Sequence, residues 1–193
     1  MITTELIDLL ELARSLVSRK AELDKSHFEQ FIEPVWDSFV RVHQDYKKSF
    51  REYAQVVFRE NFSTEDLLER IRSDSINTAD IRIELSKLIK YLPQEKPFSK
   101  DVLLSKFALK ISEYFDAGLH TSGTGDATAV FSNSEFTSAN GARYRAIIYL
   151  SRKRNQLDFM ETIEFFQDLV IELQSRYEEV ADAYYHLKKE LLT

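Results

Sequence analysis

The sequence predicts an all-α fold: an elongated helical bundle of about five to six helices, built on two long antiparallel helices with a coiled-coil-like C-terminal helix. Three observations lead to this class. Apolar residues recur with a seven-residue period over the 34 residues from Asp158 to Leu191. All four glycines lie between 118 and 141, and there are only three prolines, so most of the chain is free to be helical. No stretch of four or more residues alternates convincingly between apolar and polar side chains with turn residues at its ends.

The C-terminal periodicity predicts one long helix. Two positions of the seven-residue repeat stay apolar through five heptads, and this repeat keeps one stripe of a helix facing a partner helix. These positions, the heptad stripe, are Phe159, Phe166, Leu173, Val180 and Leu187 in the first row and Ile163, Val170, Tyr177, Tyr184 and Leu191 in the second. A helix of this length has to be paired along its length. The partner helix lies either within the chain or on a second copy.

The composition is that of one folded domain, with 44% hydrophobic and 30% charged residues in a chain of 193. There is no cysteine, which excludes disulfides and thiolate metal sites. Glu5 and Asp8 interrupt the apolar residues of the N-terminus, so it does not resemble a signal peptide. No apolar run approaches the roughly 20 residues that span a bilayer. We therefore predict a single helical domain over 1–193, located in the cytoplasm and without membrane contact.

The first two helices are expected at 4–23 and from Ser26 to about residue 62. The first has a narrow apolar stripe and should cover one side of the bundle. The second contains Pro34, which should kink the helix or restart it with the proline in a first turn. Its apolar face downstream of Pro34 is broad: Trp36, Phe39, Val40, Tyr46, Phe50, Tyr53, Ala54, Val57 and Phe58. This breadth predicts a helix over 34–62 that is buried from two sides and pairs with the C-terminal helix.

Three shorter helices should follow. Ser63 marks the start of one that ends in the polar turn 73–75. Asn77 can cap the next, and Ser99 can cap a third. The apolar face of that third helix is Leu103, Phe107, Ile111, Tyr114 and Phe115. Gly118 follows where a left-handed C-terminal cap is needed.

Residues 118–133 are the only long loop candidate, and we expect them to be mobile. Their glycines do not make a phosphate-binding loop, because a P-loop needs a strand before it and a Gly-Lys-Ser/Thr helix start after it. Asn140-Gly141 indicates a break. After it, one continuous helix should run over 142–191 and form the second long helix of the bundle.

A basic stripe is predicted in the N-terminal part of that helix. The 22 residues between Glu135 and Asp158 contain five basic side chains and no acidic one, whereas the whole chain has a net charge of −6. Traced back from Phe159 and Ile163, the two heptad positions fall on Arg145, Tyr149, Arg152 and Gln156. The candidate ligand- or partner-binding residues, here called the basic stripe, are Arg145, Tyr149, Arg152 and Lys153.

Three interpretations of the basic stripe are open. Its cations could pair with acidic side chains of neighbouring helices, such as Glu29, Glu33 and Asp37. They could instead meet an acidic protein partner. Or they could bind phosphate, a nucleotide or nucleic acid, because Arg suits bidentate phosphate contacts and Tyr suits base stacking. The acidic net charge argues against a general nucleic-acid binder.

No catalytic or metal-binding motif is present. A di-iron bundle needs Glu-x-x-His pairs and the sequence has none; HExxH and GxSxG are also absent. Asp182 and His186 can share a helix face, for which a surface hydrogen bond is the simpler interpretation. His43 falls on the apolar side of its helix, where we expect a buried histidine with satisfied hydrogen bonds. We predict no catalytic residue, no metal ion and no cofactor.

The leading functional hypothesis is a helical protein–protein interaction module, an adaptor or subunit of a larger assembly, without catalytic activity of its own. It would present a long helix face to a protein partner or, as a homodimer, to its own copy. The alternative is a small helical binding or effector protein. That protein would recognise a phosphate-bearing ligand or nucleic acid through the basic stripe.

Overall fold

The computed structural model describes residues 4, 7–12, 26, 28–57, 63–77, 99–115, 138–153 and 157–192. Within these ranges every regular element is helical and there is no strand, which confirms the predicted all-α class. The elements are the π-helical turn η1 (Phe28–Ile32) and the α-helices α3 (Glu33–Val56), α4 (Thr64–Asn77), α6 (Ser99–Phe115), α7 (Ala139–Lys153) and α8 (Phe159–Leu192).

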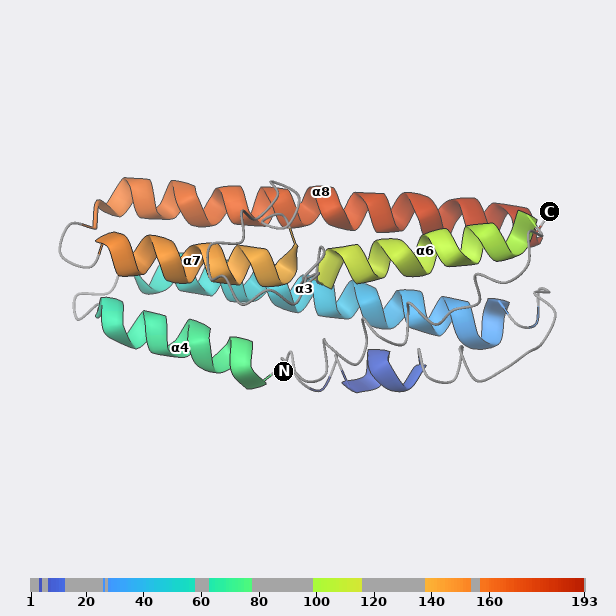
Figure 1. Cartoon of the computed structure of the whole chain (residues 1–193), viewed down its shortest axis with the longest axis horizontal. Coiled ribbons are helices and arrows are strands. Elements are labelled where there is room, and N and C mark those ends of the chain that lie inside the picture. The colour runs from blue at the N-terminus through green and yellow to red at the C-terminus, as the bar shows by residue number, and fades with distance from the viewer. Residues whose placement is uncertain are drawn as a thin grey trace, which may run out of the picture.

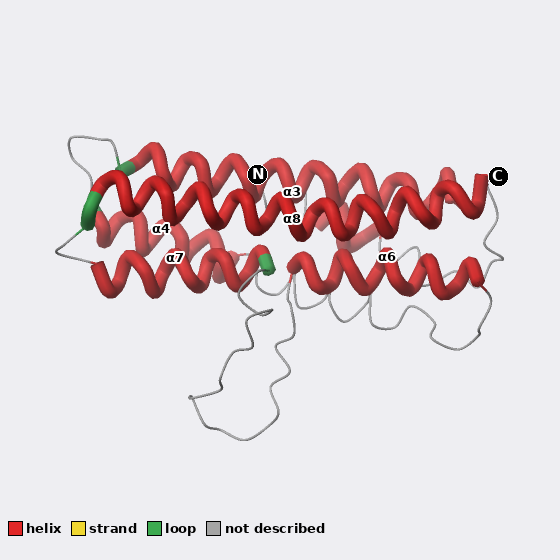
Figure 2. Tube along the Cα trace, turned by 90° about the horizontal axis from the view of Figure 1, so that it is seen from above, coloured by secondary structure: helices red, strands yellow, loops and turns green. Residues whose placement is uncertain are grey.

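The helices form an elongated bundle that α8 follows from end to end (Figure 1). α3 lies antiparallel to α8. Trp36 near the start of α3 stacks on Tyr184 near the end of α8, and Phe50 meets Phe166 at the opposite ends. α6 and α7 lie end to end along α8, and α4 packs against α7 (Figure 1 and Figure 2). Two long antiparallel helices with shorter helices around them are therefore present, as predicted.

Pro34 occupies the first turn of α3, directly after η1. Proline has no backbone N–H and a fixed φ, so it fits a position where the N–H has no helical acceptor. The proline is in the first turn of α3, as one of the two predicted alternatives requires, but Ile32 before it is also in the right-handed helical region and makes no side-chain cap, so the helical backbone continues from η1 into α3. The broad face of α3 is also buried from two sides, since Phe39 stacks parallel to Tyr177 of α8 and meets Tyr114 of α6 edge to face. Its buried residues are Val35, Trp36, Ser38, Phe39, Val42, His43, Tyr46, Phe50 and Tyr53.

The heptad stripe of α8 is buried along most of its length, but its second row enters the core gradually. Ile163 and Val170 are half-buried, whereas Tyr184 and Leu191 are buried. A straight helix has 3.6 residues per turn, so a seven-residue repeat rotates by about 20° per heptad and successive members turn towards the core. The buried residues of α8 are Thr162, Phe166, Leu169, Leu173, Val180, Ala183, Tyr184, Leu187 and Leu191.

The prediction of one continuous helix over 142–191 is wrong. α7 ends at Lys153, α8 begins at Phe159, and the two helices pack antiparallel to each other. Asp158 is the N-cap of α8, because its Oδ1 accepts a hydrogen bond from the backbone N–H of Glu161 at 2.8 Å. An Asp followed three residues later by Glu is a helix-start pattern. The sequence therefore contained a helix start at Asp158, but the regular heptads led to the prediction of one continuous helix.

α7 begins before the expected break. Ser138 caps it: its Oγ accepts a hydrogen bond from the N–H of Gly141 at 3.0 Å, and its carbonyl accepts one from the N–H of Ala142 at 2.8 Å. The pair Asn140-Gly141 therefore lies inside the first turn instead of interrupting the chain. A helical glycine costs about 1 kcal/mol, and a serine cap contributes a similar amount in the other direction.

α4 starts as predicted and ends later. The Oγ of Ser63 accepts a hydrogen bond from the N–H of Asp66 at 3.2 Å, which confirms the start. The predicted turn at 73–75 is wrong, because α4 continues through it. A tertiary contact holds this polar stretch in the helix: the hydroxyl of Tyr53 on α3 donates a hydrogen bond to the carboxylate of Asp74.

α6 begins at Ser99, as predicted. Several other predictions fall outside the described residues: the first helix beyond residue 12, the helix after Asn77, and the loop over 118–133 with its Gly118 cap. Among the helices that the structure does describe, none combines the length and the apolar character needed to cross a bilayer.

Candidate functional site

The basic stripe lies on α7 beside acidic side chains of α8. Arg145 donates two hydrogen bonds to the carboxylate of Glu172, from Nη1 at 2.7 Å and from Nη2 at 2.9 Å. Lys153 Nζ donates to Glu161 Oε2 at 2.8 Å, and this hydrogen bond raises the pKa of Lys153. Two cations of the stripe therefore pair within the chain, as the first interpretation predicts, but with partners on α8 instead of on η1 and α3.

Tyr149 is held by α8 as well. Its ring stacks on Phe165 with 4.1 Å between the ring centroids and an interplanar angle of 9°. Its hydroxyl lies 3.2 Å from Oγ1 of Thr162, which itself donates a hydrogen bond to the carbonyl of Asp158 at 2.6 Å. Because the proton of Thr162 is used there, Tyr149 is the donor. Arg152 is exposed and makes no ion pair with the residues that the structure describes.

Glu33, one of the acidic partners considered for the stripe, is the first residue of α3, and α3 begins at the end of the bundle opposite to α7 (Figure 1). There its Oε1 accepts a hydrogen bond from Lys188 Nζ at 2.7 Å and another from the hydroxyl of Tyr184 at 3.4 Å. The hydrogen bond from Lys188 lowers the pKa of the Glu33 carboxyl. Distance along the bundle therefore decides the pairing, and the sequence alone does not give that distance.

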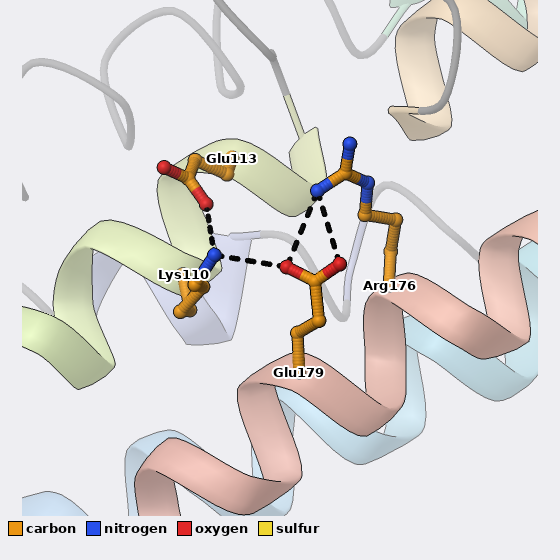
Figure 3. A network of polar contacts seen from close by, with 4 residues as sticks. All are labelled: Lys110, Glu113, Arg176 and Glu179. Atoms are coloured by element: carbon orange, nitrogen blue, oxygen red, sulfur yellow. Dashed lines mark hydrogen bonds and ion pairs between the residues drawn. The ribbon is translucent and has the colours of Figure 1, made fainter. Parts of the chain in front are cut away.

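The side of α8 that faces α6 also carries ion pairs, like the side that faces α7 (Figure 3). Lys110 Nζ donates hydrogen bonds to Glu113 at 2.7 Å and to Glu179 at 2.9 Å, and these two bonds raise the pKa of Lys110. Arg176 Nη1 lies 3.2 Å from both oxygens of Glu179. Burial opposes ionisation of Glu179, but Lys110 and Arg176 outweigh it and lower the pKa of this carboxyl. Ion pairs thus line the boundary of α8 with both α6 and α7.

Arg145 and Glu172 should show a measurable coupling energy in a double-mutant cycle built from Arg145→Ala and Glu172→Ala. Their side chains are 24% and 32% exposed and their geometry is bidentate, so we expect about 1 kcal/mol from urea unfolding. Arg152→Ala, a charge removed from the same helix at an exposed position, should change the free energy of unfolding by less than about 0.5 kcal/mol. A coupling energy of zero would show that this pair does not hold α7 on α8.

On its side towards α3, α8 meets aromatic rings instead. The ring of Trp36 stacks on Tyr184 at 4.5 Å and 7°, on Tyr177 at 5.7 Å, and meets Tyr185 edge to face at 6.0 Å. The surface above this stack, which we call the aromatic face, consists of Trp36, Val40, Tyr177, Ala181 and Tyr185. Trp36 is 7% exposed and Tyr185 is 58% exposed. The other three are half-buried.

Large apolar side chains also follow the outer surface of α8. Met160 is 61% exposed, Ile171 65%, Tyr185 58% and Leu192 42%. They are 11, 14 and 7 residues apart, which is close to whole numbers of helical turns. They therefore form one line, the outward stripe, directed away from the core and joined to the aromatic face at Tyr185.

A hydrogen-bonded polar chain crosses the middle of the bundle. The Oε1 of Gln174 accepts hydrogen bonds from Lys47 Nζ at 2.8 Å and from Nε2 of the buried His43 at 3.3 Å. Nδ1 of His43 is then the acceptor for the Tyr114 hydroxyl, 2.9 Å away. Burial lowers the pKa of His43 to about 4, with the charge of Lys47 acting in the same direction, and burial also raises the pKa of Tyr114. The expectation of a satisfied, buried His43 is confirmed.

Arg143 is the polar core residue that sequence reasoning missed. It is 1% exposed, its guanidinium lies 4.5 Å from the ring centre of Tyr46 on α3, and its Nη1 donates to the carbonyl of Asp74 on α4 at 3.1 Å. It thus joins α7 to both helices. The burial of Arg143 could have been predicted from helical spacing, because it falls on the buried row of α7 formed by Ala139, Ala142, Ala146 and Leu150.

Among the described residues, no three His, Cys, Asp or Glu side chains gather into a group that could hold a metal ion. Asp182 and His186 are both exposed on α8. No family model, no curated protein and no solved structure matches the chain. The surfaces of α3 and α8 are therefore the basis for an argument about function.

Proposed function

We propose that the chain is a helical protein–protein interaction module, an adaptor or a subunit of a larger assembly, which binds a protein through the aromatic face and the outward stripe. The observation that carries this proposal is the exposure of Tyr185 beside the Trp36 stack, with Met160 and Ile171 exposed further along the same side of α8. Trp36, Tyr177 and Tyr185 of the aromatic face adjoin one another, and adjoining apolar side chains at a surface are typical of interaction sites.

The residue types of this surface suit a protein partner. Tyrosine, tryptophan and methionine are enriched at the buried centres of interfaces. The two aromatic side chains bury large areas and lose few rotamers. The rings of Trp36 and Tyr184 both contact the ring of Tyr185, so this exposed ring is packed on one side before a partner arrives. An anchor ordered in advance lowers the entropic cost of binding.

The charged side of α8 supports the same choice of surface. Glu172 and Glu161 already neutralise two cations of the basic stripe, and Tyr149 is engaged by Thr162 and Phe165. A phosphate-bearing ligand would have to displace these partners. Among the described residues, none makes an ion pair or a side-chain hydrogen bond with the aromatic face, which favours a protein partner at this place.

A photo-crosslinking amino acid tests the proposal. Benzoylphenylalanine in place of Tyr185 should give one discrete adduct when the protein is illuminated in its native extract. The matched control is the same residue in place of Tyr144, a tyrosine of α7 that is 45% exposed, and it should give no discrete adduct. Mass spectrometry of the adduct identifies the partner. Equal labelling from the two positions, or none from Tyr185, would contradict the proposal.

A further inference from the structure

The exposed charges of α3 and α8 have opposite signs. In the described residues of α3 they are Asp37, Arg41, Lys48 and Arg51, with a net charge of +2. In α8 they are Glu161, Glu164, Asp168, Glu178, Asp182, Lys189 and Glu190, with a net charge of −5. The two helices lie side by side, and the apolar surface that we assign to a partner lies between them.

We infer that the occupant of the aromatic face is a second copy of this chain, with α3 of each copy over α8 of the other. This inference rests on the proposed function and specifies its partner. A surface that is positive on one side of an apolar strip and negative on the other is complementary to itself after a two-fold rotation. The rotation axis has to run along the strip, parallel to the helices, to bring α3 over the partner's α8.

The positions of the charges along the bundle agree with this axis. The aromatic contacts between α3 and α8 fix which residues lie level with each other. A rotation about an axis parallel to the helices does not change the position of a residue along the bundle. Lys48 and Arg51 of one copy therefore meet the region of Glu164 on the other copy. Arg41 meets the region of Glu178. The alternative rotation stacks α3 on α3 and α8 on α8. It brings like charges together and is disfavoured.

The apolar part of the contact is self-complementary as well. Tyr185 of one copy projects from α8 towards α3 of the other, where the half-buried Val40 and the edge of the largely buried Trp36 are apolar. The same contact is made twice, once on each side of the axis. Each copy thus buries its most exposed aromatic side chain of α8, Tyr185, against surface that is otherwise in water.

Charge reversal on one helix at a time tests this arrangement. One variant combines Lys48→Glu with Arg51→Glu, a second combines Glu164→Lys with Glu178→Lys, and a third contains all four changes. We expect light scattering and analytical ultracentrifugation to give a dimer for the wild type. Each paired variant should be a monomer, with a dissociation constant raised more than tenfold. The fourfold variant should return to a dimer, because its two helices again have opposite signs.

All four positions are exposed, so circular dichroism should report equal helicity and a similar melting temperature for every variant. A wild type that stays monomeric at its highest soluble concentration would overturn the inference. So would a fourfold variant that is folded and monomeric, or paired variants that still dimerise. An adduct from position 185 with a different protein, together with a monomeric wild type, would overturn self-association alone and leave the proposed function standing.

Discussion

Leu173→Asp is expected to abolish the folded state, whereas Ile171→Asp, two residues away on the same helix, should leave the fold intact. Leu173 is completely buried in the centre of α8, and Ile171 is 65% exposed. Leu173 belongs to the apolar core that the helices of the same chain form together, so a carboxylate there is removed from water. The two variants introduce the same charge and differ only in burial.

The expected size of the effect follows from the missing side chain and the added charge. Truncating a buried leucine to alanine costs about 3 kcal/mol, and an ionised carboxylate in the same place adds several more. Domains of this size are stable by about 5–15 kcal/mol, so Leu173→Asp should show no cooperative urea transition. Circular dichroism with urea gives the comparison. A folded, monomeric Leu173→Asp protein would show that this row of the heptad stripe packs between chains.

Acid is expected to destabilise the wild type more than His43→Gln. The pKa of His43 is about 4 in the folded state and 6.5 in the unfolded state. Below pH 6.5 the unfolded chain therefore binds a proton that the folded chain does not bind. The free energy of unfolding falls by about 1.4 kcal/mol per pH unit and by roughly 3 kcal/mol in total, and this loss is complete below pH 4.

The glutamine variant lacks this titration but keeps polar atoms for Tyr114 and Gln174. At pH 7 it should be less stable than the wild type, because the ring of His43 stacks on Tyr177 at 4.2 Å and glutamine does not replace that contact. The difference in stability should shrink as the pH falls towards 4. His186→Gln, at an exposed position, is the matched control and should follow the wild type at every pH. Parallel curves for wild type and His43→Gln would mean that His43 is accessible to protons in the folded state.

The boundaries of the long helices show where sequence reasoning succeeds and where it fails. The place of Pro34 in the first turn of α3 and the Ser63 cap of α4 were predictable, because both depend on local backbone chemistry. The separation of α7 from α8 was equally local, through the Asp158 cap, but the regular heptads suggested continuity. α4 runs past its predicted turn for a different reason: the contact that holds Asp74 comes from Tyr53, 21 residues away.

The candidate site was also predicted from the sequence only in part. The sequence identified the basic stripe correctly as a set of cations on one helix, and it included intrachain pairing among the interpretations. It could not name Glu172 and Glu161 as the partners, because that choice depends on α7 folding back along α8. The aromatic face was not predicted as a site, since Trp36 and Tyr185 come from helices far apart in the sequence.

The sequence by itself determined that this protein is helical, that its C-terminal helix pairs with the helix after Pro34, and which apolar row of α8 is buried in its centre. Periodicity and capping are properties of a few neighbouring residues, so they can be identified before the chain is folded. Only the tertiary structure decided which side of α8 is closed by ion pairs and which side exposes aromatic rings. That difference depends on which helix packs on each side, and it fixes the surface that remains for a partner.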